Sequence, residues 1–281
     1  RHFQEFRDIN ELPEDSGRRV LTTGGHYGYL KIAEGCDKHC TYCIIPSLRG
    51  RFRSVPQERL IAQAEHMAEQ GVKELILVAQ ETTMYGTDLY GKKTLHLLMK
   101  ELCKIKGIRW IRVLYCYPEE IYDELIQVMK EEKKICHYLD LPIQHASDRI
   151  LKRMGRRTTR AQLTATIEKL RKEIPDIVLR TTLITGFPGE TEEDHQELME
   201  FVDEMEFDRL GAFTYSPEEG TPAETMEDQI PEEIKEERRD EIMELQQEIS
   251  LEKGNDRIGQ ELLVMIEGKV SGESAYIART Y

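Results

Sequence analysis

The chain has 281 residues, of which 39% are hydrophobic and 33% are charged. This length allows two domains, or one α/β barrel with a small appendage, and the hydrophobic share excludes disorder as the main state. No apolar run approaches the roughly 18 residues that a membrane-spanning helix needs, and no leader pattern opens the chain. We therefore expect a cytoplasmic protein without a membrane partner.

The charge balance is acidic, with 53 acidic against 39 basic residues and a net charge of −14. Such a charge opposes non-specific attraction to a polyphosphate backbone. A basic protein partner therefore fits better than a naked nucleic acid, and we expect no direct sequence-specific binding of nucleic acid.

From Tyr27 onward, short β-branched or aromatic runs alternate with longer amphipathic stretches. The six predicted strands are residues 27–33, 74–79, 110–115, 137–141, 177–185 and 209–215. Their spacing leaves room for a helix between consecutive strands, which is typical of βα units around a parallel sheet. The pattern predicts an α/β fold, a partial (β/α)6 TIM-like barrel.

Capping boxes mark several predicted helix starts. They pair Ser54 with Gln57, Thr159 with Gln162 and Thr191 with Asp194, while Pro118 and Pro231 open two further helices. In the helix predicted from Gln57 to Gln70, the core-facing positions are Leu60, Ala64, Met67 and Ala68.

The composition changes after Tyr215. Residues 216–229 predict a loop, and residues 231–253 predict a charged helix with Ile234, Ile242, Leu245 and Ile249 on one side. Residues 260–278 alternate like the opening strands of a small β domain. We therefore divide the chain into a linker (1–21), the barrel with its C-terminal helix (22–253) and the start of a β domain (254–281).

Three of the six cysteines, Cys36, Cys40 and Cys43, lie within eight residues directly after the first predicted strand. Structural zinc sites normally combine two paired knuckles and four ligands, and this sequence has no second knuckle. Three thiolates can instead hold a four-iron cluster and leave one iron free to bind another molecule. A structural zinc site or a redox-sensing loop stays open as the alternative. The scattered cysteines are assigned no role, because free cysteines are usually buried small hydrophobes.

Tyr42 precedes the last of these cysteines, and the segment resembles the cysteine loop of the radical S-adenosylmethionine (SAM) superfamily. The resemblance implies that Cys36, Cys40 and Cys43 hold a 4Fe-4S cluster and form the catalytic centre. It implies that the amino and carboxylate groups of SAM bind the open iron, and that reduction cleaves SAM to a 5′-deoxyadenosyl radical. It places Tyr42 beside the adenine.

Segments that follow the predicted strands resemble the methylthiotransferases, a subgroup that inserts sulfur and a methyl group into C–H bonds. These segments are residues 77–86, 140–145, 184–190, 215–217 and 220–223. The resemblance implies that SAM is bound by Gln80, Gln144, Arg180 and Gly186.

Each of these four residues has a structural alternative. Gln80 and Gln144 can tie strand ends to loops. Gly186 can serve a turn, because only glycine takes a positive φ without steric cost. Arg180 can pair with a carboxylate of the barrel, although we favour the SAM carboxylate. We expect His145 to be structural.

Two basic clusters interrupt the acidic chain. The first contains Arg49, Arg51 and Arg53, and the second contains Arg149, Lys152, Arg153, Arg156, Arg157 and Arg160. Both lie near predicted active-site strand ends, so we expect Arg156 and Arg157 to contact phosphates or an acidic side chain of the substrate. The alternative is a solvated helix face.

The methylthiotransferases form two branches, one acting on adenosine beside the tRNA anticodon and the other on an aspartate of small-subunit ribosomal protein S-twelve. Residues 80–86 and 115–119 resemble the second branch, and the acidic charge agrees because S-twelve is basic. We therefore expect S-twelve or the small ribosomal subunit as the partner. A tRNA substrate is the first alternative, and a non-catalytic iron–sulfur or zinc module is the second.

The implied reaction uses two SAM molecules. One methylates a sulfur atom, and the other yields the radical that removes hydrogen from Cβ of the aspartate before the C–S bond forms. The resemblance also implies an electron donor and leaves room for a sulfur-delivery partner.

The sequence departs from the family pattern at both ends. The family normally carries an N-terminal domain whose three further cysteines hold a second cluster, and a C-terminal β-barrel domain called TRAM. This chain has no cysteine before Cys36 and ends part-way through the TRAM-like stretch. We expect it to hold one cluster and to cleave SAM, but not to complete methylthiolation by itself.

Overall fold

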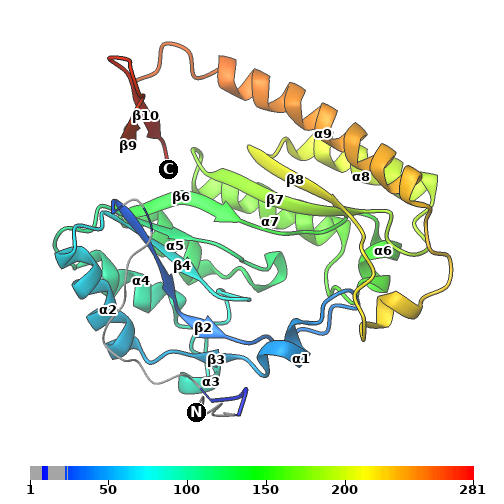
Figure 1. Ribbon diagram of the computed structural model, residues 1–281, viewed down its shortest axis with the longest axis horizontal. Coiled ribbons are helices and arrows are strands. Elements are labelled where there is room, and N and C mark those ends of the chain that lie inside the picture. Colours follow the sequence, from blue (N-terminus) through cyan, green and yellow to red (C-terminus); the bar gives the residue numbers. More distant parts are fainter. Residues whose placement is uncertain (1–7, 12–22, 24) are drawn as a thin grey trace.

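The computed structural model describes residues 8–11, 23 and 25–281. Within this part of the chain, six strands form one parallel sheet in the order β1-β4-β5-β6-β7-β8 (Figure 1). They are β1 (Tyr27–Lys31), β4 (Glu74–Val78), β5 (Trp110–Val113), β6 (Ile135–Asp140), β7 (Val178–Thr185) and β8 (Arg209–Thr214). All six predicted strands are confirmed, and so is the α/β class. Because each strand lies beside its predecessor in the chain, the crossovers wind like those of a (β/α) barrel.

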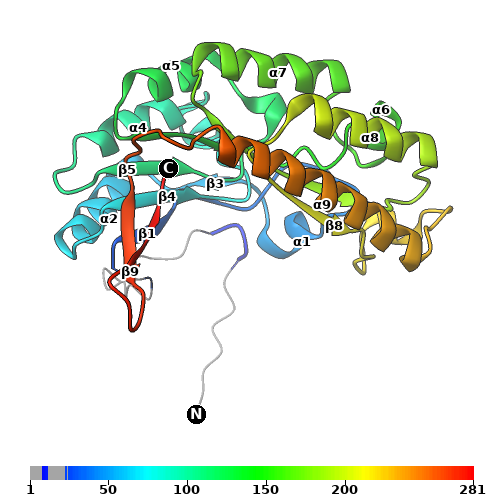
Figure 2. The ribbon, with the colours of Figure 1, turned by 90° about the horizontal axis from the view of Figure 1, so that it is seen from above.

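The crossover helices lie along one side of this sheet (Figure 2). They are α2 (Gln57–Glu69), α4 (Leu95–Cys103), α5 (Asp123–Glu131), α7 (Arg160–Glu173) and α8 (Glu192–Met205). Shorter elements are α1 (Ile45–Arg49), α3 (Thr87–Tyr90), α6 (Asp148–Arg153), η1 (Pro118–Glu120), η2 (Pro222–Thr225) and the antiparallel pair β2 (Ala33–Glu34) and β3 (Arg53–Ser54).

Burial alternates along β1, β7 and β8, because helices cover only one face of the sheet there, whereas β4 and β5 are buried almost throughout. In β7, Leu179, Thr181 and Leu183 are buried, and the residues between them are partly exposed. Strands β1 and β8 alternate in the same way. We call the uncovered face the inner sheet face; in these three strands it comprises Tyr27, Tyr29, Lys31, Val178, Arg180, Thr182, Ile184, Arg209, Gly211 and Phe213.

The predicted capping box at Ser54 is wrong. Ser54 belongs to β3, and its hydroxyl donates to Asp88 Oδ1 at 2.6 Å and accepts from the Gly86 amide at 2.9 Å. Helix α2 begins after Pro56, whose backbone is extended and which provides no side-chain cap. The prediction failed because a serine three residues before a glutamine can also form hydrogen bonds with a neighbouring loop instead of capping a helix.

Three other predictions on helix starts hold, including Pro231 at the start of the helix Glu232–Asn255, and one holds in part. Thr159 and Thr191 form complete capping boxes at α7 and α8. Pro118 opens η1, a single 3-10 turn rather than a longer helix. In α2, Leu60, Ala64 and Met67 are buried, and Ala68 packs against the core.

Helix α9 (Glu232–Asn255) confirms the predicted charged helix, but its buried face differs from the predicted one. Ile242 and Ile249 are buried and Leu245 packs against the core, whereas Ile234 is 37% exposed. The buried face also carries three long polar residues. Each makes a hydrogen bond to the barrel: Lys235 Nζ to the Tyr215 carbonyl at 2.9 Å, Arg238 Nη1 to Glu190 Oε1 at 3.0 Å, and Gln246 Nε2 to the Phe207 carbonyl at 2.8 Å.

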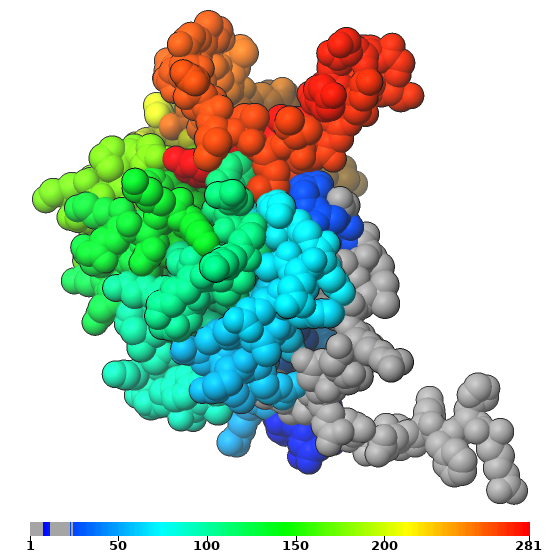
Figure 3. Space-filling model, turned by 90° about the vertical axis from the view of Figure 1, so that its left-hand side faces the viewer, coloured from blue at the N-terminus to red at the C-terminus, as the bar shows by residue number. Residues whose placement is uncertain are grey.

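The C-terminal residues form an antiparallel hairpin of β9 (Met265–Lys269) and β10 (Tyr276–Arg279), as the alternating pattern predicts. In Figure 3 the hairpin and the end of α9 stand out as two lobes at one end of the barrel. Arg279 Nη2 pairs with Glu74 Oε2 at 2.5 Å, and Arg112 Nε pairs with Glu74 Oε1 at 2.7 Å. The fully buried Glu74 therefore joins the hairpin to the start of the sheet.

The predicted domain divisions stay predictions. Residues 1–7 and 12–21 of the predicted linker lie outside the described residues. At the second division, α9 continues through Gly254 to Asn255. Among the described residues, no helix combines the length and the apolar character that crossing a membrane requires.

We predict that Asp194→Asn lowers the free energy of unfolding by about 1–2 kcal/mol at pH 7. Asp194 accepts hydrogen bonds from Thr191, Ser147 and Arg149. Burial alone would raise the pKa of Asp194, but these hydrogen bonds outweigh it and hold the pKa well below its ordinary value of 3.8. Because the folded-state pKa is the lower one, this stabilisation is present above about pH 4 and is lost as the pH falls further.

Urea unfolding at pH 7 and pH 3.5 measures this difference. Asp203→Asn is the control, because Asp203 is an exposed carboxylate of the same helix. An equal effect of the two substitutions at pH 7 would contradict the prediction.

We predict that Gly186→Ala lowers the free energy of unfolding by about 2–4 kcal/mol. Gly186 has φ +68°, and a Cβ there would lie 2.2 Å from Cγ of the buried Lys235. Gly91 also has φ +68° but nothing within 4 Å of its Cβ position, so Gly91→Ala measures the backbone contribution alone. Urea unfolding should give a smaller loss for Gly91→Ala, and Gly186→Ala should lose less in a Lys235→Ala background.

Candidate active site

The cysteine loop begins at Gly35, whose backbone is fixed from the neighbouring strand. The Gly35 amide donates to Gln80 Oε1 at 2.8 Å, and the Cys36 amide donates to the Gly50 carbonyl at 3.2 Å. Gly35 has φ +80°, and a Cβ there would lie 2.1 Å from the Arg51 carbonyl. Gln80 therefore ties the end of β4 to the loop, which is its structural alternative. Its predicted contact with SAM stays a prediction.

The far side of the loop rests on the end of α6. The Thr41 amide donates to the Met154 carbonyl at 3.0 Å, and the Thr41 hydroxyl donates to the Arg153 carbonyl at 2.8 Å. Gly155 has φ +73°, and a Cβ there would lie 2.6 Å from the His39 carbonyl. Segments more than a hundred residues apart thus hold the loop in place.

The three thiols form no disulfide and are mostly withdrawn from solvent. Cys36 is 7% exposed and Cys40 is 6% exposed, while Cys43 is half-buried. Burial raises the pKa of the Cys36 thiol to about 11 and also raises that of Cys43. Burial thus favours the protonated thiols. A bound metal cation would favour the thiolates instead, because metal coordination deprotonates a thiol.

The donor set fits an iron–sulfur cluster better than a single ion. Among the described residues, no group of three His, Cys, Asp or Glu side chains is placed to hold one metal ion. A four-iron cluster does not need such convergence, since each thiolate binds a different iron.

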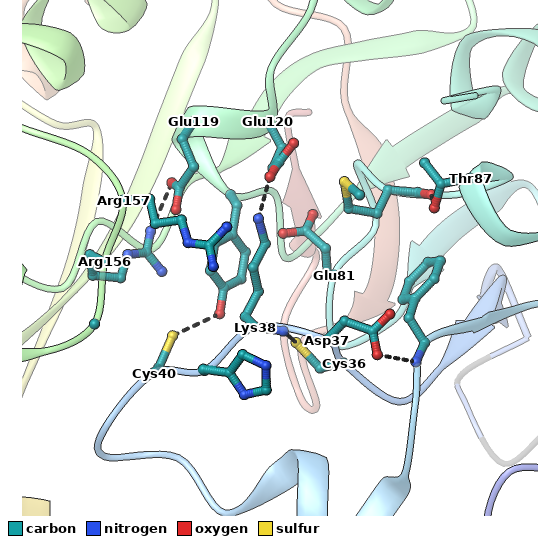
Figure 4. Close-up of a pocket in the computed structure, with 15 residues that line it drawn as sticks. Cys36, Asp37, Lys38, Cys40, Glu81, Thr87, Glu119, Glu120, Arg156 and Arg157 are labelled. Atoms are coloured by element: carbon teal, nitrogen blue, oxygen red, sulfur yellow. Dashed lines mark hydrogen bonds and ion pairs between the residues drawn. The ribbon is translucent and has the colours of Figure 1, made fainter. Parts of the chain in front are cut away.

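Cys36 and Cys40 open into a cavity of about 260 Å³ (Figure 4). Its wall includes Lys38, Glu81, Tyr117, Glu119, Glu120, Arg156 and Arg157. Cys40 Sγ lies 3.5 Å from the Tyr117 hydroxyl, and Lys38 forms an ion pair with Glu120. A partly open space whose wall carries several charged side chains therefore adjoins two of the three thiols.

Glu81 is a buried carboxylate in this wall that the sequence analysis did not assign. Its Oε1 accepts from the amide and the hydroxyl of Thr83, whereas its buried Oε2 has no hydrogen-bond partner. Burial raises the pKa of Glu81 to about 7, against the hydrogen bonds from Thr83. The available signal was an acidic residue placed just after a buried parallel strand, where barrel enzymes carry functional groups.

The two predicted substrate arginines differ in their surroundings. Arg156 is buried, with Nη2 at 3.2 Å from Glu119 Oε2 and its guanidinium 4.2 Å from the centre of the Tyr117 ring. Arg157 is exposed at the rim of the cavity. Arg156 therefore stiffens the wall beside the cysteines, and substrate contact by either residue stays a prediction.

Tyr42 belongs to a second apolar cluster at the carboxyl ends of β7 and β8. Its ring meets Phe187 edge-on at 6.4 Å, and Phe187 meets Tyr215 at 5.3 Å. Burial raises the pKa of the Tyr42 hydroxyl. A planar base would pack against such an apolar surface. The predicted contact of Tyr42 with the adenine of SAM stays a prediction.

The segment from Gly186 to Glu190 is held from behind by α9. Glu190 is buried, accepts from the Phe187 amide at 3.2 Å and lies 3.5 Å from Nε2 of the fully buried His145. His145 Nδ1 accepts from the Ser147 amide at 3.0 Å, which supports the structural role expected for this residue. Gly186 gives room to Lys235 of α9, and its predicted contact with SAM stays a prediction.

Arg180 lies in β7, and the backbone of Gln144 pairs with later residues of the same strand. Arg180 Nη1 pairs with Asp140 Oδ1 at 2.5 Å, so the barrel carboxylate that was the alternative for Arg180 is present. Gln144 has φ +72°; its amide donates to the Thr182 carbonyl and its carbonyl accepts from Ile184. No side-chain hydrogen bond of Gln144 occurs in the described part of the chain. Their predicted contacts with SAM are untested.

The family model described as the Radical SAM superfamily matches residues 30–202. A protein of Lachnoclostridium phytofermentans named ribosomal protein uS12 methylthiotransferase RimO is 63% identical over 278 residues. The match covers 99% of this chain and 63% of that protein. A protein of the same name from Clostridium perfringens is 57% identical over 98% of this chain and 61% of its own length. The chain thus spans less than two thirds of these relatives.

Among solved structures, the radical SAM methyltransferase TsrM from Kitasatospora setae has a TM-score of 0.58 at 16% identity, covering 70% of this chain and 38% of its own. Methylornithine synthase (PylB) has a TM-score of 0.53 at 13% identity, covering 78% of this chain and 62% of its own. These two likenesses concern the fold. The family match covers more than half of the chain, and with the three-cysteine loop at the sheet edge it establishes that this chain belongs to the radical SAM superfamily.

Proposed function

We propose that this chain is the radical core of an enzyme that adds a methylthio group to Cβ of an aspartate in ribosomal protein uS12, the protein S-twelve of the sequence analysis. One observation carries the proposal: a buried three-cysteine loop opens into a cavity in a chain 63% identical to a relative named for this activity. We favour the uS12 substrate over the tRNA alternative because relatives at 63%, 57% and 54% identity carry the uS12 name.

The cluster would be held by Cys36, Cys40 and Cys43, and the family implies SAM as its ligand. When bound, the reduced cluster and SAM supply an adenosyl radical that can take hydrogen from an unactivated carbon. The chain holds the ligands rigidly in advance, because Gln80 and the Met154 carbonyl fix the loop from two sides. This preorganisation reduces the rearrangement needed on binding.

Glu81 is suited to the ammonium group of SAM. Its Oε2 is buried and without a hydrogen bond, and it lines the same cavity as Cys36. An ammonium donor would satisfy that oxygen and favour the charged carboxylate. The apolar cluster around Tyr42 and Phe187 would keep water from the reacting groups on the other side.

Other requirements of the reaction lie outside the described residues. An electron donor must reduce the cluster, and a sulfur source is needed that we assign to a second cluster in a further domain or to a delivery partner. A modifier of the small ribosomal subunit works where ribosomes assemble, so we place the enzyme in the cytoplasm.

Deletion of the gene in its host tests the proposal directly. We predict that mass spectrometry shows complete loss of the methylthio group from the target aspartate of uS12, with the methylthio-adenosine of digested tRNA unchanged. The wild-type gene should restore the modification, and a Cys40→Ala gene should not, because it lacks one cluster ligand. Loss of methylthio-adenosine instead would refute the assignment and make the exposed arginines candidates for phosphate contacts.

A further inference from the structure

The inner sheet face carries basic and aromatic groups in a chain whose net charge is −14. Arg180 of β7 is in register with Asp140 of β6 on one side and with Arg209 of β8 on the other. Two arginines and one aspartate therefore lie in line across three neighbouring strands, and of the two arginines only Arg180 pairs with Asp140. The balance is a local positive charge on a face that the crossover helices do not cover.

Asp140 holds Arg180 by only one of its nitrogens. Asp140 is 2% exposed, and its Oδ1 accepts from Arg180 Nη1 while its Oδ2 accepts from the Tyr115 amide at 3.0 Å. Nε and Nη2 of Arg180 make no hydrogen bond within the described residues, and its side chain is 38% exposed. A guanidinium fixed in this way keeps two parallel N–H donors for a second carboxylate.

Arg209 adds charge without a competing partner. In the described part of the chain its side chain makes one hydrogen bond, to the Asp208 carbonyl at 2.8 Å. The neighbouring Asp208 carboxylate accepts from the Leu179 amide and lies 3.7 Å from Arg257 Nη2, so its charge has its own partner. An incoming carboxylate at Arg180 would thus meet the charges of Arg180 and Arg209 against the charge of Asp140.

Tyr115 stands beside Arg180 in a strained conformation. Its φ is +59°, which is unfavourable for a bulky residue, and its side chain is 47% exposed. The Tyr115 carbonyl accepts from the Thr82 amide at 3.1 Å. Burial alone would lower the pKa of Arg180, but Asp140 raises it, and the hydroxyl of Tyr115 adds to that rise. Strain that the surroundings maintain is common where a side chain must face a ligand. On the same face, Phe213 is 58% exposed.

A carboxylate that meets Arg180 could come from SAM or from the target aspartate. Arg180 does not line the cavity into which Cys36 and Cys40 open, whereas Glu81 and Arg156 do. The exposed rings of Tyr115, beside Arg180, and of Phe213, four residues further along β8 than the partner of Arg180, suit a peptide segment, which needs apolar contact along its length. Both observations favour the target over SAM.

Resting on the proposed function, we propose that Arg180 binds the side-chain carboxylate of the target aspartate, with the target segment lying on the inner sheet face. Arg180 is then a residue that determines specificity for aspartate. Hydrogen is removed from the carbon next to this carboxylate, so fixing the carboxylate fixes the reacting carbon. An asparagine at the target position could accept a hydrogen bond only through its side-chain oxygen. Its amide nitrogen is itself a donor and could not accept from the second N–H of Arg180.

The test measures two affinities of the cluster-loaded full-length enzyme, one for SAM and one for a synthetic uS12 peptide. The peptide carries either the target aspartate or asparagine at that position. We expect the wild-type enzyme to prefer the aspartyl peptide, and Arg180→Gln to weaken its binding roughly tenfold or more while changing the asparaginyl peptide and SAM less than about twofold. Arg180→Lys keeps the positive charge but lacks the two parallel N–H donors. Its preference for the aspartyl peptide should lie between those of the wild-type enzyme and Arg180→Gln.

Arg109→Gln is the matched control, because Arg109 is an exposed arginine just before β5 and outside the inner sheet face. It should leave both affinities unchanged. If Arg180→Gln weakens SAM binding and keeps the preference for aspartate, the carboxylate at Arg180 belongs to SAM and the inference is overturned.

The proposed function can fail separately. If the wild-type enzyme does not prefer the aspartyl peptide and gene deletion leaves uS12 modified, the proposed function and the inference fall together. If deletion removes the modification but Arg180→Gln keeps the wild-type preference, only the inference falls.

Discussion

The cysteine loop depends on being tied at both of its ends, and most of the fold serves that constraint. Gln80 reaches the Gly35 amide only because β4 lies beside β1 in the parallel sheet. The Met154 carbonyl reaches Thr41 only because the crossover after β6 returns over the same edge of the sheet. A short loop alone cannot hold buried thiols in place for a cluster. Where water is excluded, the backbone amides of the loop need hydrogen-bond partners from the rest of the fold.

The polar buried face of α9 also provides partners for buried groups, in this case at the strand ends that border the site. Lys235 fills the space beside Gly186, and Arg238 neutralises the buried Glu190, which in turn faces His145. A buried charge is tolerated when it is paired and hydrogen-bonded, and removing one partner leaves the other uncompensated. Helix α9 therefore acts as a support for the strand ends that border the site, although it contributes no group to the cavity wall among the described residues.

Local patterns in the sequence predict the elements whose formation depends on neighbouring residues alone. Short β-branched or aromatic runs between longer amphipathic stretches located all six strands. The hydroxyl caps at Thr159 and Thr191 located two helix starts. Ser54 misled because a local pattern does not say which neighbour a hydroxyl will meet, and Ile234 misled because apolar spacing cannot reveal a buried face built from Lys235 and Arg238. The cysteine spacing indicated the cluster, but the buried Glu81 and the register of Arg180 with Asp140 arise only when distant strands pair.

The central claim is that the cysteine loop holds a 4Fe-4S cluster with one iron open to SAM. Anaerobic reconstitution, followed by iron and sulfide analysis and low-temperature electron paramagnetic resonance with and without SAM, tests it most directly. The account predicts about four irons and four sulfides per cluster-binding loop, a signal of the reduced cluster that SAM alters, and loss of both in Cys40→Ala. Bound zinc without sulfide, or a cluster whose signal is indifferent to SAM, would contradict it.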